Sequence, residues 1–182
     1  MKRFLFLQLI LCSCLNNNSY DDDWIQLFNG NDLSGWEIRN GTAEISVLNN
    51  EIVGKTVKNT PNTFLCTKED YRNFILEFEV NVENDINSGV QIRSNSISKY
   101  KDGVVHGYQI EIDPSDRAYS GGIFDERRRG WLYDLSENKK GREAFNVNAW
   151  NKFHVEAIED TIRTWVNGVH CSYFIDSISD TG

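Results

Sequence analysis

Proline, cysteine and histidine are scarce in this chain of 182 residues, which holds 2, 4 and 3 of them. No CxxC pair and no cluster of histidine with cysteine occurs, so we expect no zinc or other metal site. Basic residues are also in deficit, because 19 Lys and Arg against 27 Asp and Glu give a net charge of −8. An acidic surface repels phosphate backbones, so we expect no nucleic-acid partner, whereas a neutral carbohydrate is not penalised.

Internal repeats and a helical period are absent as well. The length suits one domain, and a content of 40% hydrophobic and 12% aromatic residues is typical of a globular protein. The dominant period is two, which is typical of strands with one buried face. The clearest alternation of apolar and polar residues covers four segments, 74–82, 90–93, 108–113 and 153–158.

Turn signals separate these segments. Asn167-Gly168 predicts a hairpin, because a type I′ turn needs positive φ at both central residues. Asn49-Asn50 and Glu159-Asp160 interrupt other apolar stretches. About a dozen short strands with tight turns predict an all-β, antiparallel two-sheet sandwich.

The first residues are typical of an export signal. Lys2 and Arg3 precede an apolar run over 4–15 that is too short to span a bilayer. The run ends in Leu11-Cys12-Ser13-Cys14, which resembles a bacterial lipobox. We therefore expect 1–14 to be a lipoprotein signal segment and Cys14 to be lipidated, with an ordinary secretory signal as the alternative.

The rest of the chain follows from that interpretation. Residues 15–23 are polar and acidic and predict a flexible tether. The predicted sandwich domain then covers 24–182. We expect the protein to be exported and to lie in the periplasm or on the outer-membrane surface, attached to the membrane only through its lipid. We expect Cys66 and Cys171, which lie in apolar stretches of that domain, to be unpaired.

Polar side chains alternate along two of the predicted strands. Because residues two apart point to one side, Gln91 and Arg93 are expected to share an outer face. Gln109, Glu111 and Asp113 are expected to share the outer face of the second strand. If the strands are neighbours, Arg93 lies within reach of Glu111 or Asp113. An ordinary solvated face with weak surface ion pairs is the alternative.

Further features around this face favour a sugar ligand. Several glycines, such as Gly89 and Gly122, allow close approach of the backbone. Carboxylates and guanidinium groups are interleaved, and Trp131 and Tyr133 offer flat surfaces on which sugar rings stack. Together these features fit a neutral polyhydroxyl ligand.

Several motifs, in order, resemble the 3-keto-disaccharide hydrolase domain family, which was long a domain of unknown function. The resemblance covers about 24–182 and rests on Leu27-Phe28-Asn29-Gly30-Asn31-Asp32-Leu33-Ser34-Gly35-Trp36, Asn87-Ser88-Gly89-Val90-Gln91-Ile92-Arg93, Gly107-Tyr108-Gln109-Ile110-Glu111-Ile112-Asp113, the segment 121–133, Trp150-Asn151 and Trp165-Val166-Asn167-Gly168.

The resemblance implies a concanavalin A-like jelly roll with its site on a concave face. Two departures stand out. Many members carry Glu then Gln on the central strand, whereas here Gln109 precedes Glu111. The family also ends with one more strand, which we expect to be missing after Gly182, so that the chain is a C-terminally truncated domain with an unpaired sheet edge.

The implied activity is cleavage of glycosides that a separate enzyme has oxidised at C3. A C3 ketone acidifies the C2 proton, so a base can remove it, the C1 leaving group departs, and water adds back. This chemistry needs no cofactor in the protein, and the sequence gives no sign of structural calcium. Glu111 is the expected acid or base and Arg93 its electrostatic partner, with Asp113 and His106 as further candidates for proton transfer.

Other side chains are expected to contact the substrate. The expected contacts are Gln91, Gln109, Asp125, Glu126, Arg128 and Trp131. A carbohydrate-binding module on the same fold is the main alternative, because such a module needs no carboxylate. A glycoside hydrolase with paired Glu111 and Asp113 ranks third, because both carboxylates would approach the sugar from one side.

Overall fold

The computed structural model describes residues 4–14, 24–83 and 86–176, with the backbone alone described for the first of these ranges. The expected tether, 15–23, and the expected truncated end of the domain lie outside the described residues. The elements are β1 (Phe4–Cys14), β2 (Trp24–Ile25), β3 (Trp36–Asn40), β4 (Glu44–Leu48), β5 (Glu51–Lys55), β6 (Thr63–Thr67), β7 (Phe74–Val82), β8 (Ser88–Asn95), η1 (Lys101–Gly103), β9 (His106–Ile112), β10 (Ile123–Glu126), β11 (Gly130–Tyr133), α1 (Lys139–Arg142), β12 (Trp150–Ile158), β13 (Thr161–Val166) and β14 (Val169–Ile175).

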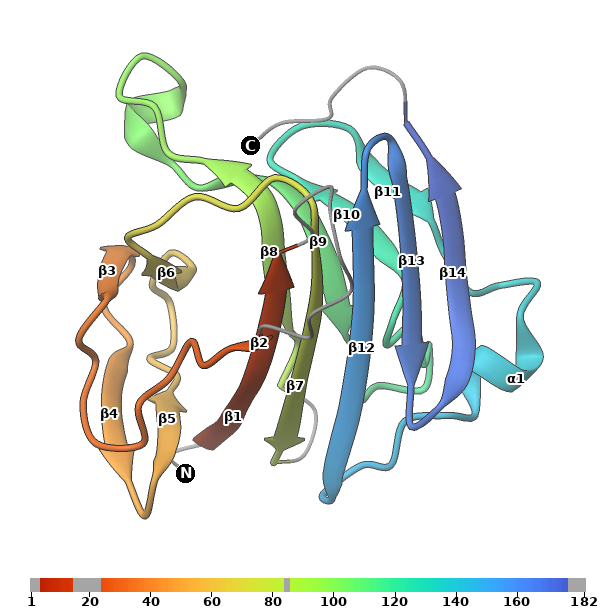
Figure 1. Cartoon of the computed structure of the whole chain (residues 1–182), viewed down its shortest axis with the longest axis horizontal. Coiled ribbons are helices and arrows are strands. Elements are labelled where there is room, and N and C mark those ends of the chain that lie inside the picture. The colour runs from red at the N-terminus through yellow and green to blue at the C-terminus, as the bar shows by residue number, and fades with distance from the viewer. Residues whose placement is uncertain (1–3, 15–23, 84–85, 177–182) are drawn as a thin grey trace.

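The strands form two facing layers (Figure 1). One layer is a sheet in the order β14-β13-β12-β7-β1-β5-β4, in which β2 also pairs with β1. The other layer contains the sheet β11-β10-β9-β8, and β3 and β6 form a separate pair. Every described pairing is antiparallel, so the prediction of an all-β antiparallel sandwich is confirmed.

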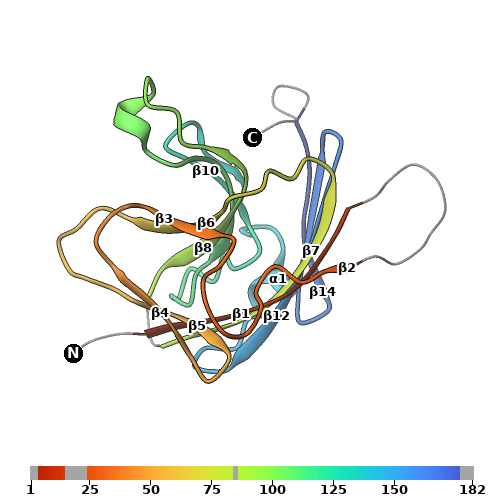
Figure 2. The ribbon, with the colours of Figure 1, turned by 60° about the vertical axis from the view of Figure 1, so that its left-hand side comes forward.

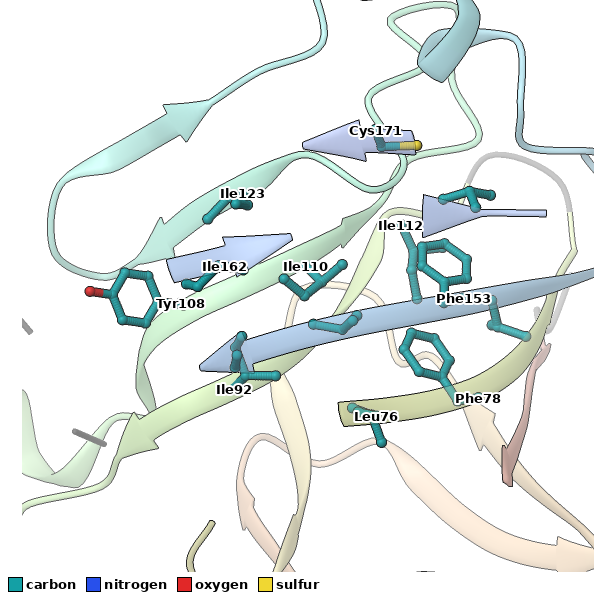
Figure 3. Close-up of a cluster of buried hydrophobic side chains, with 14 of the residues drawn as sticks. Leu76, Phe78, Ile92, Tyr108, Ile110, Ile112, Ile123, Phe153, Ile162 and Cys171 are labelled. Atoms are coloured by element: carbon teal, nitrogen blue, oxygen red, sulfur yellow. The ribbon is translucent and has the colours of Figure 1, made fainter. Parts of the chain in front are cut away.

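The core lies between these two layers (Figures 2 and 3). In β7 the burial pattern alternates strictly, as the period of two in the sequence predicts. Phe78 of β7 and Phe153 of β12 lie directly opposite each other, with their rings stacked 4.8 Å apart. Ile110 and Ile112 of β9 fill the core from the other layer. This packing fixes which side chains of β9 point away from the core.

The predicted hairpin between β13 and β14 is confirmed. Asn167 and Gly168 both have positive φ, 49° and 80°, as a type I′ turn requires. Asn49 and Asn50, between β4 and β5, also have positive φ. These turns set the register that places polar side chains on the outer faces of the sheets.

The N-terminal segment occupies an interior position in the larger sheet. Strand β1 lies between β5 and β7 and is antiparallel to both (Figure 1). Its register joins Phe4 to Lys55 of β5 and Cys14 to Phe74 of β7. The segment in which we expected an export signal is thus a strand in this structure, and it fills the slot between β5 and β7.

Cys66 and Cys171 are free, as predicted. Burial raises the pKa of both thiols, to about 11 at Cys171, so neither is a reactive thiolate near neutral pH. Within the described part of the chain, no helix is long and apolar enough to span a membrane.

Candidate functional site

A row of four side chains crosses the sheet β8-β11 on the face that points away from the core. Gln91 lies opposite Gln109, Gln109 opposite Phe124, and Phe124 opposite Trp131. Directly opposite residues on neighbouring strands share a face, so all four project to the same side. The row therefore begins with two amides and ends with two aromatic rings.

Glu111 lies one strand repeat from Gln109 and is bordered by glycines. On β8 it faces Gly89, and on the other side its backbone N–H donates to Gly122 O at 2.9 Å. A Cβ at Gly89 would lie 2.5 Å from Cγ of Gln109, so only glycine lets the Gln109 side chain lie across this position. Because these glycines have no side chains, they leave space around the Glu111 carboxylate.

A chain of hydrogen bonds runs along this face to Glu111. Ser94 Oγ donates to Gln91 Oε1 at 2.6 Å, and Gln91 Nε2 donates to Gln109 Oε1 at 3.0 Å. Gln109 Nε2 then donates to Glu111 Oε2 at 2.9 Å, and Asn87 Nδ2 donates to Oε1 at 2.6 Å. These bonds fix the orientation of each amide and direct two donors at the carboxylate.

Arg117 supplies the positive charge of the site. Its Nε donates to Asp113 Oδ2 at 2.6 Å, and its Nη2 lies 3.6 Å from Glu111 Oε1. Its guanidinium carbon also lies 5.2 Å and 5.5 Å from the ring centroids of Trp131 and Tyr119. The Arg117 side chain is 46% exposed, whereas the Glu111 side chain beside it is only 4% exposed.

The two carboxyl groups have opposite pKa shifts. Burial raises the pKa of Glu111 above its ordinary value, and the amide hydrogen bonds only partly offset this effect. Burial acts in the same direction at Asp113, but hydrogen bonds from Ser115 and Arg117 outweigh it and lower the pKa. Two such carboxyl groups can have different roles, with Asp113 kept ionised and Glu111 as the group that accepts and releases a proton.

The prediction that Arg93 faces Glu111 is wrong. The pairing of β8 with β9 shifts register between Ile92 and Asn95, and Arg93 itself has a φ of 46°. This β-bulge turns the buried guanidinium to the edge of the sandwich, where it donates to Arg72 O at 2.8 Å and Glu159 O at 2.5 Å. Arg93 is therefore a structural residue, and Ser94 takes its place on the polar face.

His106 does not reach the site either. Its Nδ1 lies 2.8 Å from Val104 O, and its ring packs on Tyr100 with centroids 4.0 Å apart. Five residues separate His106 from Glu111 along β9, or roughly 16 Å at about 3.3 Å per residue. Direct proton transfer between these two side chains is excluded in this geometry.

Asp125 and Arg128 belong to a different network, so their prediction as substrate contacts is corrected. Asp125 is opposite Tyr108 and fully buried on the core side of β10. It pairs with Arg128 at 2.6 Å and with Arg129, which also contacts Asp176 at 2.6 Å. The arginines balance the buried carboxylates, which would otherwise be costly.

The structure places the remaining predicted contacts on the polar face, at different distances from Glu111. Gln91, Gln109 and Trp131 belong to the row described above. Glu126 faces Gly107 and pairs with Arg127 at 3.2 Å. Gly107 is four residues from Glu111 along β9, so Glu126 lies roughly 13 Å away, at the far end of the face.

Several contributors to the site were not among the residues predicted from the sequence, chiefly Asn87, Ser94, Arg117, Tyr119 and Phe124. Arg117 follows Asp113 by four residues through a tight turn, and a loop sequence gives no period from which its direction follows. Phe124 is the second residue of β10, whose four residues between glycines and arginines are too few to show a period. Asn87 lies in a motif that resembles the family, just before the alternating segment 90–93, so no period predicts where its side chain points.

Among the residues whose side chains are described, no group of three or more His, Cys, Asp and Glu side chains could hold a metal ion. The site therefore offers acid–base, cationic, amide and aromatic groups. This set can bind a polyhydroxyl ring, move a proton and stabilise a developing oxyanion.

Comparison with known proteins identifies one matching family and a similar fold. The sequence pattern of the 3-keto-alpha-glucoside-1,2-lyase-like domain matches residues 23–182. A crystal structure of a candidate glycosyl hydrolase from Parabacteroides distasonis superposes with a TM-score of 0.62 at 19% identity, covering 93% of this chain and 79% of that one. No match was found among curated proteins. The structural likeness establishes the jelly-roll fold, and strand β1 lies outside the family match.

Proposed function

Because the chain belongs to the 3-keto-alpha-glucoside-1,2-lyase-like domain family, we propose that it cleaves glycosidic bonds of sugars that carry a ketone at C3. The family name points to α-glucosides and to bond cleavage between C1 and its substituent with loss of the C2 proton. The glycosyl hydrolase description of the Parabacteroides distasonis protein supports the same broad class of substrate.

The observation that carries this proposal is the environment of Glu111. Its carboxyl has a raised pKa, accepts two amide hydrogen bonds and lies 3.6 Å from the guanidinium of Arg117. A base with a pKa closer to neutrality removes a carbon acid proton more effectively than an ordinary carboxylate. A cation beside it stabilises the enolate that forms.

The proposed reaction is an elimination followed by the addition of water. Glu111 takes the C2 proton, and the electron pair of the C2–H bond moves into an enolate whose charge lies on the C3 oxygen, near Arg117. The enolate then collapses, the C1–O bond breaks, and the leaving oxygen takes a proton from Glu111 or water. Addition of water across C1 and C2 gives the free 3-keto sugar and completes a net hydrolysis.

A sugar must reach the Glu111 carboxylate, which is only 4% exposed and lies 3.6 Å from Arg117 Nη2. The guanidinium is half exposed and lies over Tyr119 and Trp131, so the proposal includes a rotation of the Arg117 side chain when the sugar binds. A sugar that displaces the guanidinium from the indole can itself stack on Trp131. Gln91 and Gln109, held by their own hydrogen bonds, are placed to orient its hydroxyl groups.

A non-catalytic carbohydrate-binding module is the second candidate. The low exposure of Glu111, 4% at the side chain, favours it, because a binding module does not need access to a carboxylate. In that case Trp131, Gln91 and Gln109 bind the sugar, and Glu111 only orients Gln109 and Asn87.

Turnover distinguishes these two functions. The protein is incubated separately with a 3-keto-α-disaccharide and with its unoxidised parent, and released monosaccharide is measured. The proposal predicts release from the oxidised sugar alone. Binding of both sugars without release from either supports the binding module and contradicts the enzyme.

A further inference from the structure

A second row of polar and aromatic side chains lies on the outer face of the larger sheet. Glu77 of β7 lies opposite His154 of β12, His154 opposite Trp165 of β13, and Trp165 opposite His170 of β14. We call these four residues the Trp165 row. It is separated from Glu111 by the core, because Phe78 and Phe153 of the same strands point inward between the layers (Figure 3).

The indole of Trp165 is held from both sides. The ring of His154 lies 5.1 Å away at 76°, and the ring of His170 lies 5.2 Å away at 68°. Both are edge-to-face contacts, which are favourable for aromatic pairs. Two neighbouring strands thus fix the orientation of a half-buried tryptophan on an outer face, where an isolated exposed ring would be free to rotate.

Charged groups of both signs lie beside His154, which contacts this indole. Glu77 accepts from Lys152 Nζ at 2.7 Å and contacts His154 Nδ1 at 3.0 Å. His154 Nε2 lies 3.5 Å from Glu156. Carboxylate acceptors and an ammonium donor therefore lie close to His154, next to the indole, an arrangement that suits hydroxyl groups better than an ion.

The Trp165 row borders a shallow cavity of about 350 Å³, lined by Glu77, Lys152, His154, Trp165 and Gly168. This volume lies in the lower part of the range of small-molecule sites, about 300–1,000 Å³. Gly168 is part of the β13–β14 turn, so the cavity is open at the end of the sheet. An open cavity of this size accommodates a ring from the middle or the end of a longer chain.

We propose that this cavity is a second carbohydrate site, which binds one sugar ring of a neutral glycan with its apolar face on Trp165. Glu77, Lys152 and His154 hydrogen-bond its hydroxyl groups at the rim. The choice of a sugar rests on the proposed function, but the site lies on the opposite layer from Glu111 and needs no catalytic group. It tethers the enzyme to a glycan while a different sugar unit is processed.

The Trp165 site is tested by ¹⁹F NMR of the intact protein labelled with 5-fluorotryptophan. The chain has 5 tryptophans, and single Trp→Phe variants assign their signals. Unoxidised maltotetraose, isomaltotetraose and cellotetraose are titrated in turn, so that the result does not depend on turnover. The proposal predicts a saturable shift of the Trp165 signal with at least one of them. Trp36, buried in β3 and outside the cavity, is the control and should not move.

Lys152→Met and His154→Phe variants complete the test. Each keeps bulk at its position but removes donors, so each should weaken the Trp165 titration at least several-fold while the unfolding transition stays cooperative. A Trp165 signal that does not move with any of the three sugars overturns the proposal. A shift confined to Trp131 also overturns it, and places sugar binding at the Glu111 site alone. Failure of 3-keto-disaccharide cleavage, by contrast, leaves this titration unaffected.

Discussion

The Nη2 atom of Arg117 lies 3.6 Å from Oε1 of Glu111, and the same guanidinium donates through Nε to Asp113 at 2.6 Å. One cation thus connects a carboxyl whose pKa is raised to a carboxyl whose pKa is lowered. Opposite shifts in neighbouring carboxyl groups are a mark of acid–base sites. The relationship makes Glu111 the group to test for proton transfer and Asp113 the group that holds Arg117.

The pH dependence of cleavage should report the raised pKa of Glu111. If its ionised form is the base, kcat/KM rises with pH through a pKa above the ordinary value of 4.5. Burial is the main cause of the raised pKa, and the charge of Asp113 adds to it. Asp113→Asn removes that charge, so the acidic limb of the profile should move to lower pH. An unchanged limb, or one that moves to higher pH, contradicts this assignment.

Arg117→Met should lower kcat for a 3-keto-glycoside by about 10²–10³-fold, the usual cost of one electrostatic group at a developing oxyanion. Arg117→Lys keeps the charge but loses the fork that reaches both carboxylates, so it should recover only part of the rate. Because Arg117 also pairs with the buried Asp113 carboxylate, its removal should lower the free energy of unfolding, so kcat is compared per folded molecule. A variant with the wild-type kcat would remove Arg117 from the mechanism.

Arg93→Met is the matched comparison, since its guanidinium is buried and bonds to backbone. The carbonyls of Arg72 and Glu159 lose a charged donor, which should cost about 2–3 kcal/mol of unfolding free energy. Cleavage per folded molecule should stay at the wild-type value. Chemical denaturation and an active-fraction assay separate the two effects. Stability within experimental error of the wild type would disprove the structural role.

The N-terminal segment has two incompatible fates that one labelling experiment separates. We propose that Cys14 is lipidated in an exported protein, which would remove the residues before it, yet residues 4–14 form β1 in this structure. Radioactive fatty acid should label the wild type and leave Cys14→Ala unlabelled. An unlabelled wild type would end the lipoprotein proposal and leave an ordinary secretory signal or a retained β1 as the two remaining fates.

If labelling occurs, processing should also alter stability. Strand β1 pairs with β5 on one side and with β7 on the other. Loss of β1 therefore leaves one edge of each of these two strands without its hydrogen-bond partner. The processed protein should therefore unfold at a lower temperature than unprocessed Cys14→Ala, unless another strand enters the slot between β5 and β7. Hydrogen exchange at β5 and β7 amides tells these outcomes apart, because a filled slot keeps them protected.

The sandwich and half of the polar face could be predicted from the sequence for a simple reason. In β7 and β9 a strict period of two meets a buried core on one side, so Gln109 and Glu111 could point only outward. The same logic failed at Arg93, because a β-bulge inserts an extra residue and inverts the face. No local sequence signal marks that bulge; it is visible only in the register with β9.

The other errors arose where regular structure was hidden. Asp125 and Arg128 lie in and after a short strand whose face depends on pairing with β9 and not on any pattern of its own. His106 lies at the far end of the strand that carries Glu111. An imidazole can transfer protons, but this one is too far from Glu111 to act at the same site. Arg117 comes from a turn, where only the three-dimensional path decides which groups meet.

The most direct test of the account is the cleavage rate of Glu111→Gln. Glutamine preserves the size of the side chain but offers one acceptor oxygen instead of two, so it keeps the bond from either Asn87 or Gln109. The variant should still fold, which chemical denaturation checks. Without the base, release of monosaccharide from a 3-keto-α-disaccharide should fall by about 10²–10⁴-fold. A folded Glu111→Gln protein that releases the sugar at the wild-type rate would contradict the assignment of this site.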